Sequence, residues 1–306
     1  MNDLPYSKPA SHIVWFYALP LFIAFMMFGM MVWVIAMRWH YPYQLEWIEG
    51  SVLQHVVRLT EGKPIYQMPD MTFAPALYTP LYYYISATFA TFMGNNLPTL
   101  RLVSILATVG SSFCISGIAW KLTHSRLAAA LAFLMVATPF RFTDFWFDVA
   151  RVDSLWSFFL LATVWSLAHI NKHQPMQRWI LLAAALCVCA VYTKQTTLFL
   201  MPFFAIAVLL WNGFRCAALF TGWSAAFLIL VCLVFQWQSD NLFYFFTMQM
   251  AANHNMTSGF PLHFFKGDLL ESVPIILVFT IYGLSKKCQT DFRQGWGWIV
   301  ILSGFI

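Results

Sequence analysis

Residues 13–37 read IVWFYALPLFIAFMMFGMMVWVIAM, a run without a single charged side chain. A helix of about 20 apolar residues crosses a hydrocarbon core roughly 30 Å thick. The run is too long for the core of a signal peptide, and no small-residue cleavage site follows it. We therefore expect residues 13–37 to form an uncleaved first membrane span.

Similar apolar segments recur along the whole chain. Apolar residues make up 60% of the 306 positions and charged residues only 9%, whereas about a quarter of a soluble domain is charged. In lipid, only helices and closed barrels satisfy their backbone polar groups, and these runs are too long for barrel strands. The remaining segments lie near 76–93, 101–120, 126–142, 154–170, 178–193, 196–211, 217–237, 272–285 and 296–306. The sequence predicts an all-α, polytopic membrane protein.

The distribution of Lys and Arg decides how many of these segments cross. If all crossed, with the N-terminus inside, most of the short basic loops would lie outside, against the positive-inside rule. The affected residues are Lys121, Arg126, Lys172, Arg178, Arg215, Lys286, Lys287 and Arg293. Placing 76–93 in the membrane interface moves all of them to the cytoplasm, and the tyrosines of this segment favour that depth. We therefore expect about nine crossings.

This topology makes residues 38–100 one long extracytoplasmic loop with two short juxtamembrane helices. The first is expected from about Glu46 to Thr60, before the stop signal Gly62-Lys63-Pro64, and the second begins at Tyr78-Thr79-Pro80. Residues 143–153, 192–195 and 238–271 become further external loops. No long polar linker divides the chain, so residues 1–306 are expected to form one transmembrane domain. Because the last apolar segment is only about half a crossing long, we expect the chain to be truncated at its C-terminus.

Two acidic clusters fall in these external loops. Glu46 and Glu49 stand at positions i and i+3, so on a helix they share a face, close to the interfacial Trp47. The second cluster combines Asp144, Asp148 and Asp153 with two arginines among aromatic residues. Charge at membrane depth is costly and often marks function. Each cluster also has a purely structural explanation. The first could be a solvated acidic loop, and the second could be a set of salt bridges that neutralise one another.

Within the second cluster, Asp144 and Asp148 are spaced i and i+4. Arg151 is placed to pair with Asp148 or to hold an anion. Five further residues add to a candidate substrate-binding set that already contains Asp148 and Arg151. Cations suited to a phosphate leaving group are Arg101 and Lys194, and the polar candidates are Gln195, Tyr82 and His254. Snorkelling interfacial cations are the structural alternative for the lysine and arginine residues.

An ordered series of motifs resembles a known superfamily. The series runs Glu49-Gly50, then Arg58 to Tyr66 (RLTEGKPIY), Tyr78 to Tyr84 (YTPLYYY), Leu100 to Ser104 (LRLVS), Arg151-Val152-Asp153 and Lys194-Gln195-Thr196. It resembles the GT-C superfamily of integral-membrane glycosyltransferases over roughly residues 40–200. The similar branch holds the protein mannosyltransferases, the lipid A aminoarabinose transferase and the RgtA/B/C/D-like transferases.

The resemblance implies a polyprenyl-phosphate sugar donor and a carboxylate of the first external loop as general base. Carried over by position, it suggests Glu49 or Glu46 as the base and Asp153 as the second acid. Ile48 stands where many members have an Asp before the Glu, so the choice between the two glutamates stays open. Some members use a divalent cation and others do not. No metal ligand is assigned here, and a divalent cation is left open.

The expected function is inverting transfer of a sugar to an acceptor on the extracytoplasmic side, in the plasma or inner membrane of a bacterium. Its partners are the lipid-linked donor, membrane lipid and an acceptor that the sequence does not name. Nucleic acid is not expected, because the formal charge of +5 reflects cytoplasmic loops. Two alternatives are a polytopic transporter and a non-catalytic membrane subunit. Transporters usually place ionisable residues at the midplane of broken helices, whereas these acids lie in loops.

Overall fold

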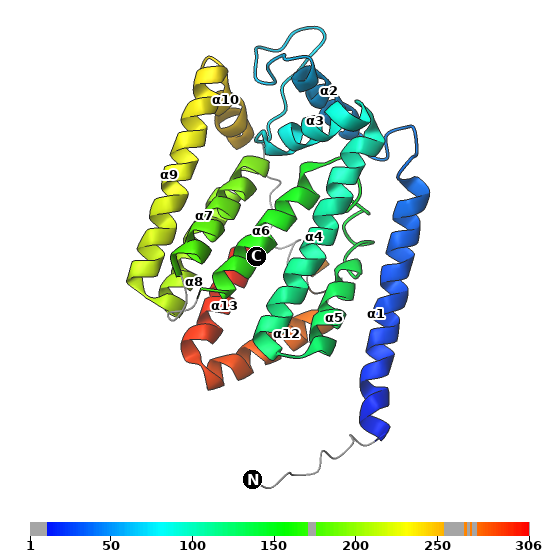
Figure 1. The fold of residues 1–306 in the computed structure, drawn as a ribbon, viewed down its shortest axis with the longest axis vertical. Coiled ribbons are helices and arrows are strands. Elements are labelled where there is room, and N and C mark those ends of the chain that lie inside the picture. The colour runs from blue at the N-terminus through cyan, green and yellow to red at the C-terminus, as the bar shows by residue number, and fades with distance from the viewer. Residues whose placement is uncertain (1–10, 171–175, 254–265, 268–269, 271–273, 306) are drawn as a thin grey trace.

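A computed structural model describes residues 11–170, 176–253, 266–267, 270 and 274–305. The described chain is helical and contains no strand, which confirms the prediction of an all-α polytopic membrane protein. Figure 1 shows a bundle of roughly parallel helices, with short helices gathered across one end. The helices are α1 (Ser11–Arg38), α2 (Glu49–Thr60), α3 (Leu81–Met93), α4 (Leu97–Thr123), α5 (Arg126–Leu134), η1 (Met135–Ala137), α6 (Val152–Ala168), α7 (Met176–Thr193), α8 (Thr197–Asn212), α9 (Phe214–Gln238), α10 (Leu242–Tyr244), η2 (Phe245–Met250), α12 (Pro274–Thr290) and α13 (Phe292–Phe305).

Four helices of the described chain are long and apolar enough to cross a membrane. They are α4, α7, α9 and the part of α1 from Ala18 to Arg38. The shorter apolar helices α6 and α8, and the segment α5–η1, run beside them in the bundle (Figure 1). The predicted number of nine crossings stays a prediction, because length and composition identify candidates and do not place a membrane.

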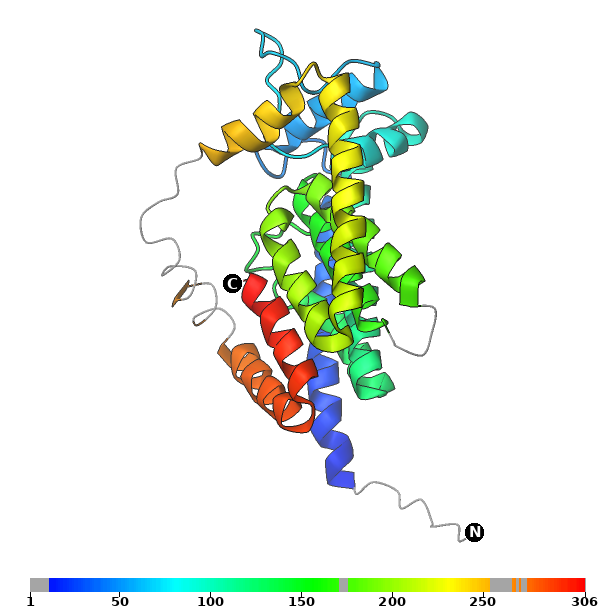
Figure 2. The ribbon, with the colours of Figure 1, turned by 90° about the vertical axis from the view of Figure 1, so that its left-hand side faces the viewer.

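The two short helices predicted between the first two spans are present as α2 and α3. They lie across the end of the bundle where α4 begins, as Figures 1 and 2 both show. Helix α2 ends before Gly62, whose φ of +70° is readily adopted only by glycine. The amphipathic α2 turns Val52, His55 and Val56 into the protein, where it packs on α3. These helices carry the acidic segment to the bundle.

The predicted start of α2 at Glu46 is wrong, because the helix begins at Glu49. Glu46 lies in the preceding turn, where its Oε2 accepts a hydrogen bond from the Ile48 amide at 2.9 Å. A carboxylate that binds the local backbone favours a turn over a continued helix. The two glutamates therefore do not share a helix face, and their side chains take different partners.

The bundle core depends on a close contact between α4 and α6. A Cβ atom at Gly110 would come within 2.6 Å of the Phe158 ring, and one at Gly117 within 2.4 Å of Trp165 Nε1. Small residues let helices in a membrane approach closely, so that packing and dispersion hold them together. The contact fixes the start of α6, where Arg151 and Asp153 lie, against the start of α4.

Candidate functional site

The most enclosed polar contact joins α2 to α4. Arg101 donates from Nε to Glu49 Oε1 at 2.9 Å and from Nη2 to Glu49 Oε2 at 2.7 Å, a bidentate pair across 52 residues of sequence. Both side chains are 0% exposed. A buried charge is costly unless it is paired and fully hydrogen-bonded. The pair therefore ties the first turn of α2 to the first turns of α4.

Both oxygens of Glu49 accept a further hydrogen bond. The amide of Leu45 donates to Oε2 at 2.6 Å, and the amide of Ala150 donates to Oε1 at 2.8 Å. Burial raises the pKa of the Glu49 carboxyl, but the bonds from Arg101, Ala150 and Leu45 outweigh it, so the pKa lies below its ordinary value. This carboxylate is charged, enclosed and occupied on both oxygens. It has no open lone pair for an acceptor hydroxyl.

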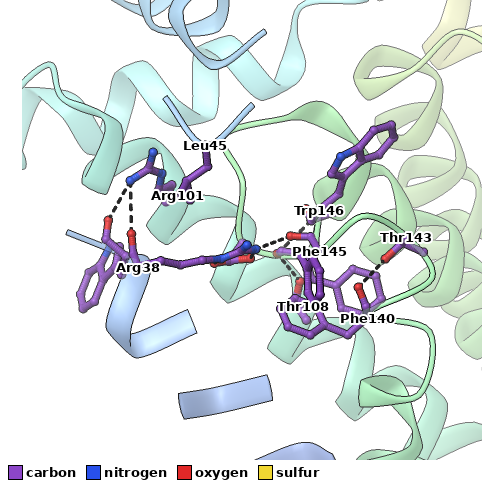
Figure 3. A network of polar contacts seen from close by, with 12 residues as sticks. Arg38, Leu45, Arg101, Thr108, Phe140, Thr143, Phe145 and Trp146 are labelled. Atoms are coloured by element: carbon purple, nitrogen blue, oxygen red, sulfur yellow. Dashed lines mark hydrogen bonds and ion pairs between the residues drawn. The ribbon is translucent and has the colours of Figure 1, made fainter. Parts of the chain in front are cut away.

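The remaining donors of Arg101 hold the segment that follows α1. Its Nη1 donates to the Tyr41 carbonyl at 2.6 Å and to the Trp39 carbonyl at 3.2 Å, and its Nη2 donates to the Tyr43 carbonyl at 2.8 Å. Figure 3 shows the guanidinium turned toward the backbone beyond Arg38. The expectation that Arg101 binds a phosphate does not fit this geometry, because its donors point to protein oxygens and the side chain is 0% exposed.

A second set of charges forms a chain that is open to solvent. Arg151 Nη1 lies 3.0 Å from Glu46 Oε1, and Arg151 Nε donates to Asp153 Oδ2 at 3.0 Å. Lys194 Nζ completes it, donating to Asp153 Oδ1 at 2.7 Å. The side chains of Glu46, Arg151, Asp153 and Lys194 are 13%, 9%, 18% and 21% exposed. We call these four residues the open charge chain.

Three different parts of the fold supply the open charge chain. Glu46 comes from the turn before α2, Arg151 and Asp153 from the start of α6, and Lys194 from the turn between α7 and α8. The Arg151 guanidinium lies 3.8 Å from the centre of the Trp146 ring, and Lys194 Nζ lies 4.9 Å from that of Trp156. Aromatic faces hold these cations in place without neutralising them.

Asp148 takes a different partner from the one the sequence suggested. It is fully buried and pairs with Arg38 at the end of α1, whose Nε donates to Asp148 Oδ2 at 2.7 Å. Figure 3 shows the Arg38 side chain reaching across to the Phe145 carbonyl. The suggested pair of Arg151 and Asp148 is wrong, because Arg151 is turned toward Glu46 and Asp153.

The helical i, i+4 relation of Asp144 and Asp148 also fails. Residues 141–147 form turns, and Asp144 and Phe145 have φ of +51° and +59°. Asp144 is exposed, whereas Asp148 is enclosed, so they do not act together. Consecutive residues in the left-handed region cannot continue a right-handed helix.

The other predicted substrate-binding residues have mixed surroundings. Tyr82 is 0% exposed, and its hydroxyl donates to the Leu100 carbonyl at 3.1 Å and contacts Ser104 Oγ at 3.0 Å. Gln195 donates from Nε2 to the Leu77 carbonyl at 2.7 Å, beside Lys194. His254 lies outside the described residues. Tyr82 therefore joins α3 to α4 inside the protein, and a contact with substrate does not fit its position.

A cavity of about 650 Å³ lies beside the open charge chain. It is enclosed by α4, α5, η1, the turns of 139–147 and the start of α6, and mainly apolar side chains line it. Asp153 and Trp146 belong both to its wall and to the surroundings of the charge chain. The arrangement thus places carboxylates and cations at the edge of an apolar space.

Two contacts of the charged residues were not predicted from the sequence, Arg38 with Asp148 and Trp146 with Arg151. Arg38 was not singled out, although it is the first charged residue after the first apolar run, where an arginine is expected near the interface. Trp146 is one of the aromatic residues around the second acidic cluster. Among the described residues, no three His, Cys, Asp or Glu side chains are arranged to hold a metal ion.

Comparison with known proteins gives one match. The family model described as dolichyl-phosphate-mannose-protein mannosyltransferase matches residues 75–237, which is more than half of the chain. This range contains Arg101, Arg151, Asp153 and Lys194, while Glu46 and Glu49 precede it. Searches of curated proteins and of solved structures found no match. The chain therefore belongs to the dolichyl-phosphate-mannose-protein mannosyltransferase family and is a membrane glycosyltransferase of the GT-C type.

Proposed function

We propose that the protein transfers a sugar from a polyprenyl-phosphate donor to an acceptor hydroxyl, with inversion, and that Glu46 is the general base. The observation that carries the proposal is the open charge chain at the edge of an apolar cavity. A lipid-linked donor has the matching parts: an anionic phosphate, a sugar and an apolar tail. The family match supports a lipid-linked donor of this kind.

The choice between the two glutamates follows from their partners. Glu49 is enclosed, and each of its two carboxylate oxygens accepts two hydrogen bonds. Glu46 is 13% exposed, and among the described residues its Oε1 contacts Arg151 alone. A donor phosphate that takes the Arg151 guanidinium would release this oxygen for an acceptor hydroxyl. Binding of the donor would thus prepare the base.

In the proposed step, Glu46 removes the proton of the acceptor hydroxyl as its oxygen bonds to the anomeric carbon. The bond from that carbon to the phosphate oxygen breaks, and the polyprenyl phosphate leaves with the electron pair. A single displacement of this kind inverts the anomeric centre, through a transition state resembling an oxocarbenium ion. Arg151 and Lys194 stabilise the charge on the leaving phosphate. Asp153 positions both cations.

The distribution of basic loops supports an extracytoplasmic site. The open charge chain lies at the end of the bundle that carries α2 and α3, away from the basic residues near the ends of α4 and α12 (Figure 1). Under the positive-inside rule, the basic end faces the cytoplasm. The site then faces the side on which lipid-linked sugars serve as donors.

The test measures consumption of labelled polyprenyl-phosphate sugars by membranes that contain the protein. We expect Glu46→Gln to lower the initial rate by about 10²- to 10⁴-fold, as is typical for loss of a general base. Glu61→Gln is the matched control, because Glu61 lies at the end of α2 and, within the described part of the chain, its one ion pair is with the exposed Lys63. It should keep the full rate.

Full activity of Glu46→Gln would overturn the assignment of the base. If Glu49→Gln instead removed activity without loss of folded protein, the two roles would be reversed. Full activity of the double variant Glu46→Gln/Asp153→Asn would rule out catalysis by the open charge chain as a whole. That last result would assign catalysis to other residues of the chain.

A further inference from the structure

A polar cavity lies at the opposite end of the bundle from the open charge chain. Its volume is about 270 Å³, and its walls come from the ends of α4, α6 and α8 and from α12 and α13. The lining residues that matter here are Lys121, His124, Trp211, Lys287, Gln294 and Trp298. Figures 1 and 2 show that the turn between α12 and α13 lies near this end of the molecule. The cavity belongs to no part of the proposed catalytic site.

The cavity carries positive charge without acidic partners. Among the described residues, no ion pair includes Lys121 or Lys287. The nearby Asp291 uses Oδ1 to accept a hydrogen bond from the Gln294 amide at 3.1 Å, so it caps the start of α13. His124, the C-cap of α4, also lines the cavity. Two cations that share a cavity without a carboxylate favour an anionic ligand.

The position of the cavity relative to the membrane indicates which anion lies beside it. Arg101 and Lys121 lie near opposite ends of α4, and a rise of about 1.5 Å per residue separates them by roughly 30 Å. This distance equals the thickness of a hydrocarbon core. If Arg101 lies at one membrane surface, Lys121 lies at the other. At that depth the abundant anion is the phosphate of a membrane lipid.

The aromatic wall of the cavity is fixed in place. The rings of Trp211 and Trp298 lie 4.9 Å apart, and Trp211 Nε1 donates to the Gln294 carbonyl at 3.2 Å. Gly297 allows this approach, since a Cβ there would come within 1.9 Å of Trp211 Nε1. Indoles are enriched at the membrane interface, where one edge contacts lipid chains and the other polar groups. The wall therefore suits a lipid headgroup.

We propose that this cavity binds the phosphate group of an anionic glycerophospholipid, with Lys121 and Lys287 as the cationic contacts. The volume suits a headgroup, while the acyl chains would remain in the surrounding bilayer. Because the lipid would touch α4, α8, α12 and α13 together, it would hold the last two helices against the bundle. A soluble phosphate compound shares the same chemistry, so the test must separate the two sources.

The test uses the full chain in detergent, titrated with phosphatidylglycerol and followed by native mass spectrometry. The variant Lys121→Gln/Lys287→Gln should weaken phosphatidylglycerol binding by about 30-fold, from the usual contribution of each lysine near an anionic surface. The matched control Arg126→Gln/Lys286→Gln removes the same charge from neighbouring positions outside the cavity wall. It should bind almost as tightly as the original chain. Phosphatidylcholine should bind weakly to all three proteins.

Two results would overturn the proposal. Equal weakening in both double variants would mean that lipid responds to net charge rather than to this cavity. Displacement of the lipid by soluble glycerol phosphate at similar concentrations would assign the cavity to a soluble ligand. Melting temperatures in the absence of added lipid check the folding of each variant. If the double variant does not fold, Lys121→Gln alone, with Arg126→Gln as its control, gives the same comparison with a smaller expected change.

Discussion

Glu46 and Glu49 are three positions apart, yet they occupy opposite environments. Glu49 opens α2, is 0% exposed and is held by Arg101 and two backbone amides. Glu46 lies one turn earlier, is 13% exposed and contacts Arg151 in the open charge chain. Neighbouring acids of the same type can therefore serve different purposes. One fixes the position of a loop, and the other remains accessible for chemistry.

The Arg101–Glu49 pair and the open charge chain differ in their contact with solvent. Arg101 loses contact with water entirely, so it needs every donor satisfied, and its donors reach six protein oxygens. Arg151 keeps some contact with water and stacks on Trp146. Removing one partner of a buried pair is costly, whereas pairs in contact with water contribute little. The two arginines should thus respond differently to the same substitution.

The largest effect on stability is expected for Arg101→Met. It leaves the buried Glu49 carboxylate without its cation, so the free energy of unfolding should fall by about 3–5 kcal/mol. Thermal denaturation in detergent measures this change. The double variant Arg101→Met/Glu49→Gln should recover part of the loss, because it removes the unpaired charge. A loss below about 1 kcal/mol for Arg101→Met would mean that the pair is not enclosed.

A smaller effect on stability is expected for Arg151→Met. Glu46 and Asp153 keep contact with water, and Asp153 keeps Lys194, so the free energy of unfolding should fall by about 1–2 kcal/mol. The rate of sugar transfer should fall by about 10²-fold or more, because the leaving phosphate loses a donor. Parallel melting curves and rate measurements separate the two effects. Greater destabilisation than in Arg101→Met would reverse the comparison of the two arginines.

The smallest effect on stability is expected from protonation of His55, which is buried on α2 as a neutral group. Its Nε2 accepts a hydrogen bond from the Ala76 amide at 2.8 Å, and its Nδ1 contacts the Ser51 carbonyl at 2.7 Å. Burial lowers its pKa from the ordinary 6.5, the Ser51 carbonyl opposes this shift, and Arg58 adds to it. The contribution of His55 to stability is therefore complete above about pH 6.5 and is lost as the pH falls through the lowered value.

Hydrogen exchange at the Ala76 amide should detect this loss, with faster exchange in mild acid after correction for the intrinsic rate. The expected change is about 1 kcal/mol, the usual contribution of one hydrogen bond. His55→Leu should remove the pH dependence, while His40→Leu, at an exposed position, should retain it. A pH dependence that survives in His55→Leu would assign the effect to another group. His55 and Glu49 lie on the same helix, but loss of the neutral His55 hydrogen bond should cost less stability than loss of the cation that pairs with the buried Glu49 carboxylate.

Sequence reasoning predicted the helical architecture closely, for a simple physical reason. A lipid environment forces the backbone to satisfy its own hydrogen bonds, so long apolar runs become helices whatever their neighbours. The segments 101–120, 178–193 and 217–237 accordingly lie within α4, α7 and α9. The charge count also identified 76–93 as part of a separate loop region, and α3 lies with α2 across one end of the bundle.

Predictions from helical spacing failed where the chain forms a turn instead of a helix. The i, i+3 relation of Glu46 and Glu49 assumed a continuous helix, but the Glu46 carboxylate binds the Ile48 amide and α2 starts later. The i, i+4 relation of Asp144 and Asp148 failed because two residues there take positive φ. In each case, hydrogen bonds and turns outside the helical pattern decided the geometry.

The sequence by itself determined that this is a helical membrane protein with its acidic residues gathered in a few loops. It also singled out the four residues of the open charge chain as candidates, because charges are so rare in the chain. Only the tertiary structure decided which charges are buried and which remain open. Burial of Glu49 depends on Arg101, and the position of Asp153 depends on Lys194. The energy of a charge in a membrane protein depends on its nearest partner and on water, and neither can be read from the order of residues.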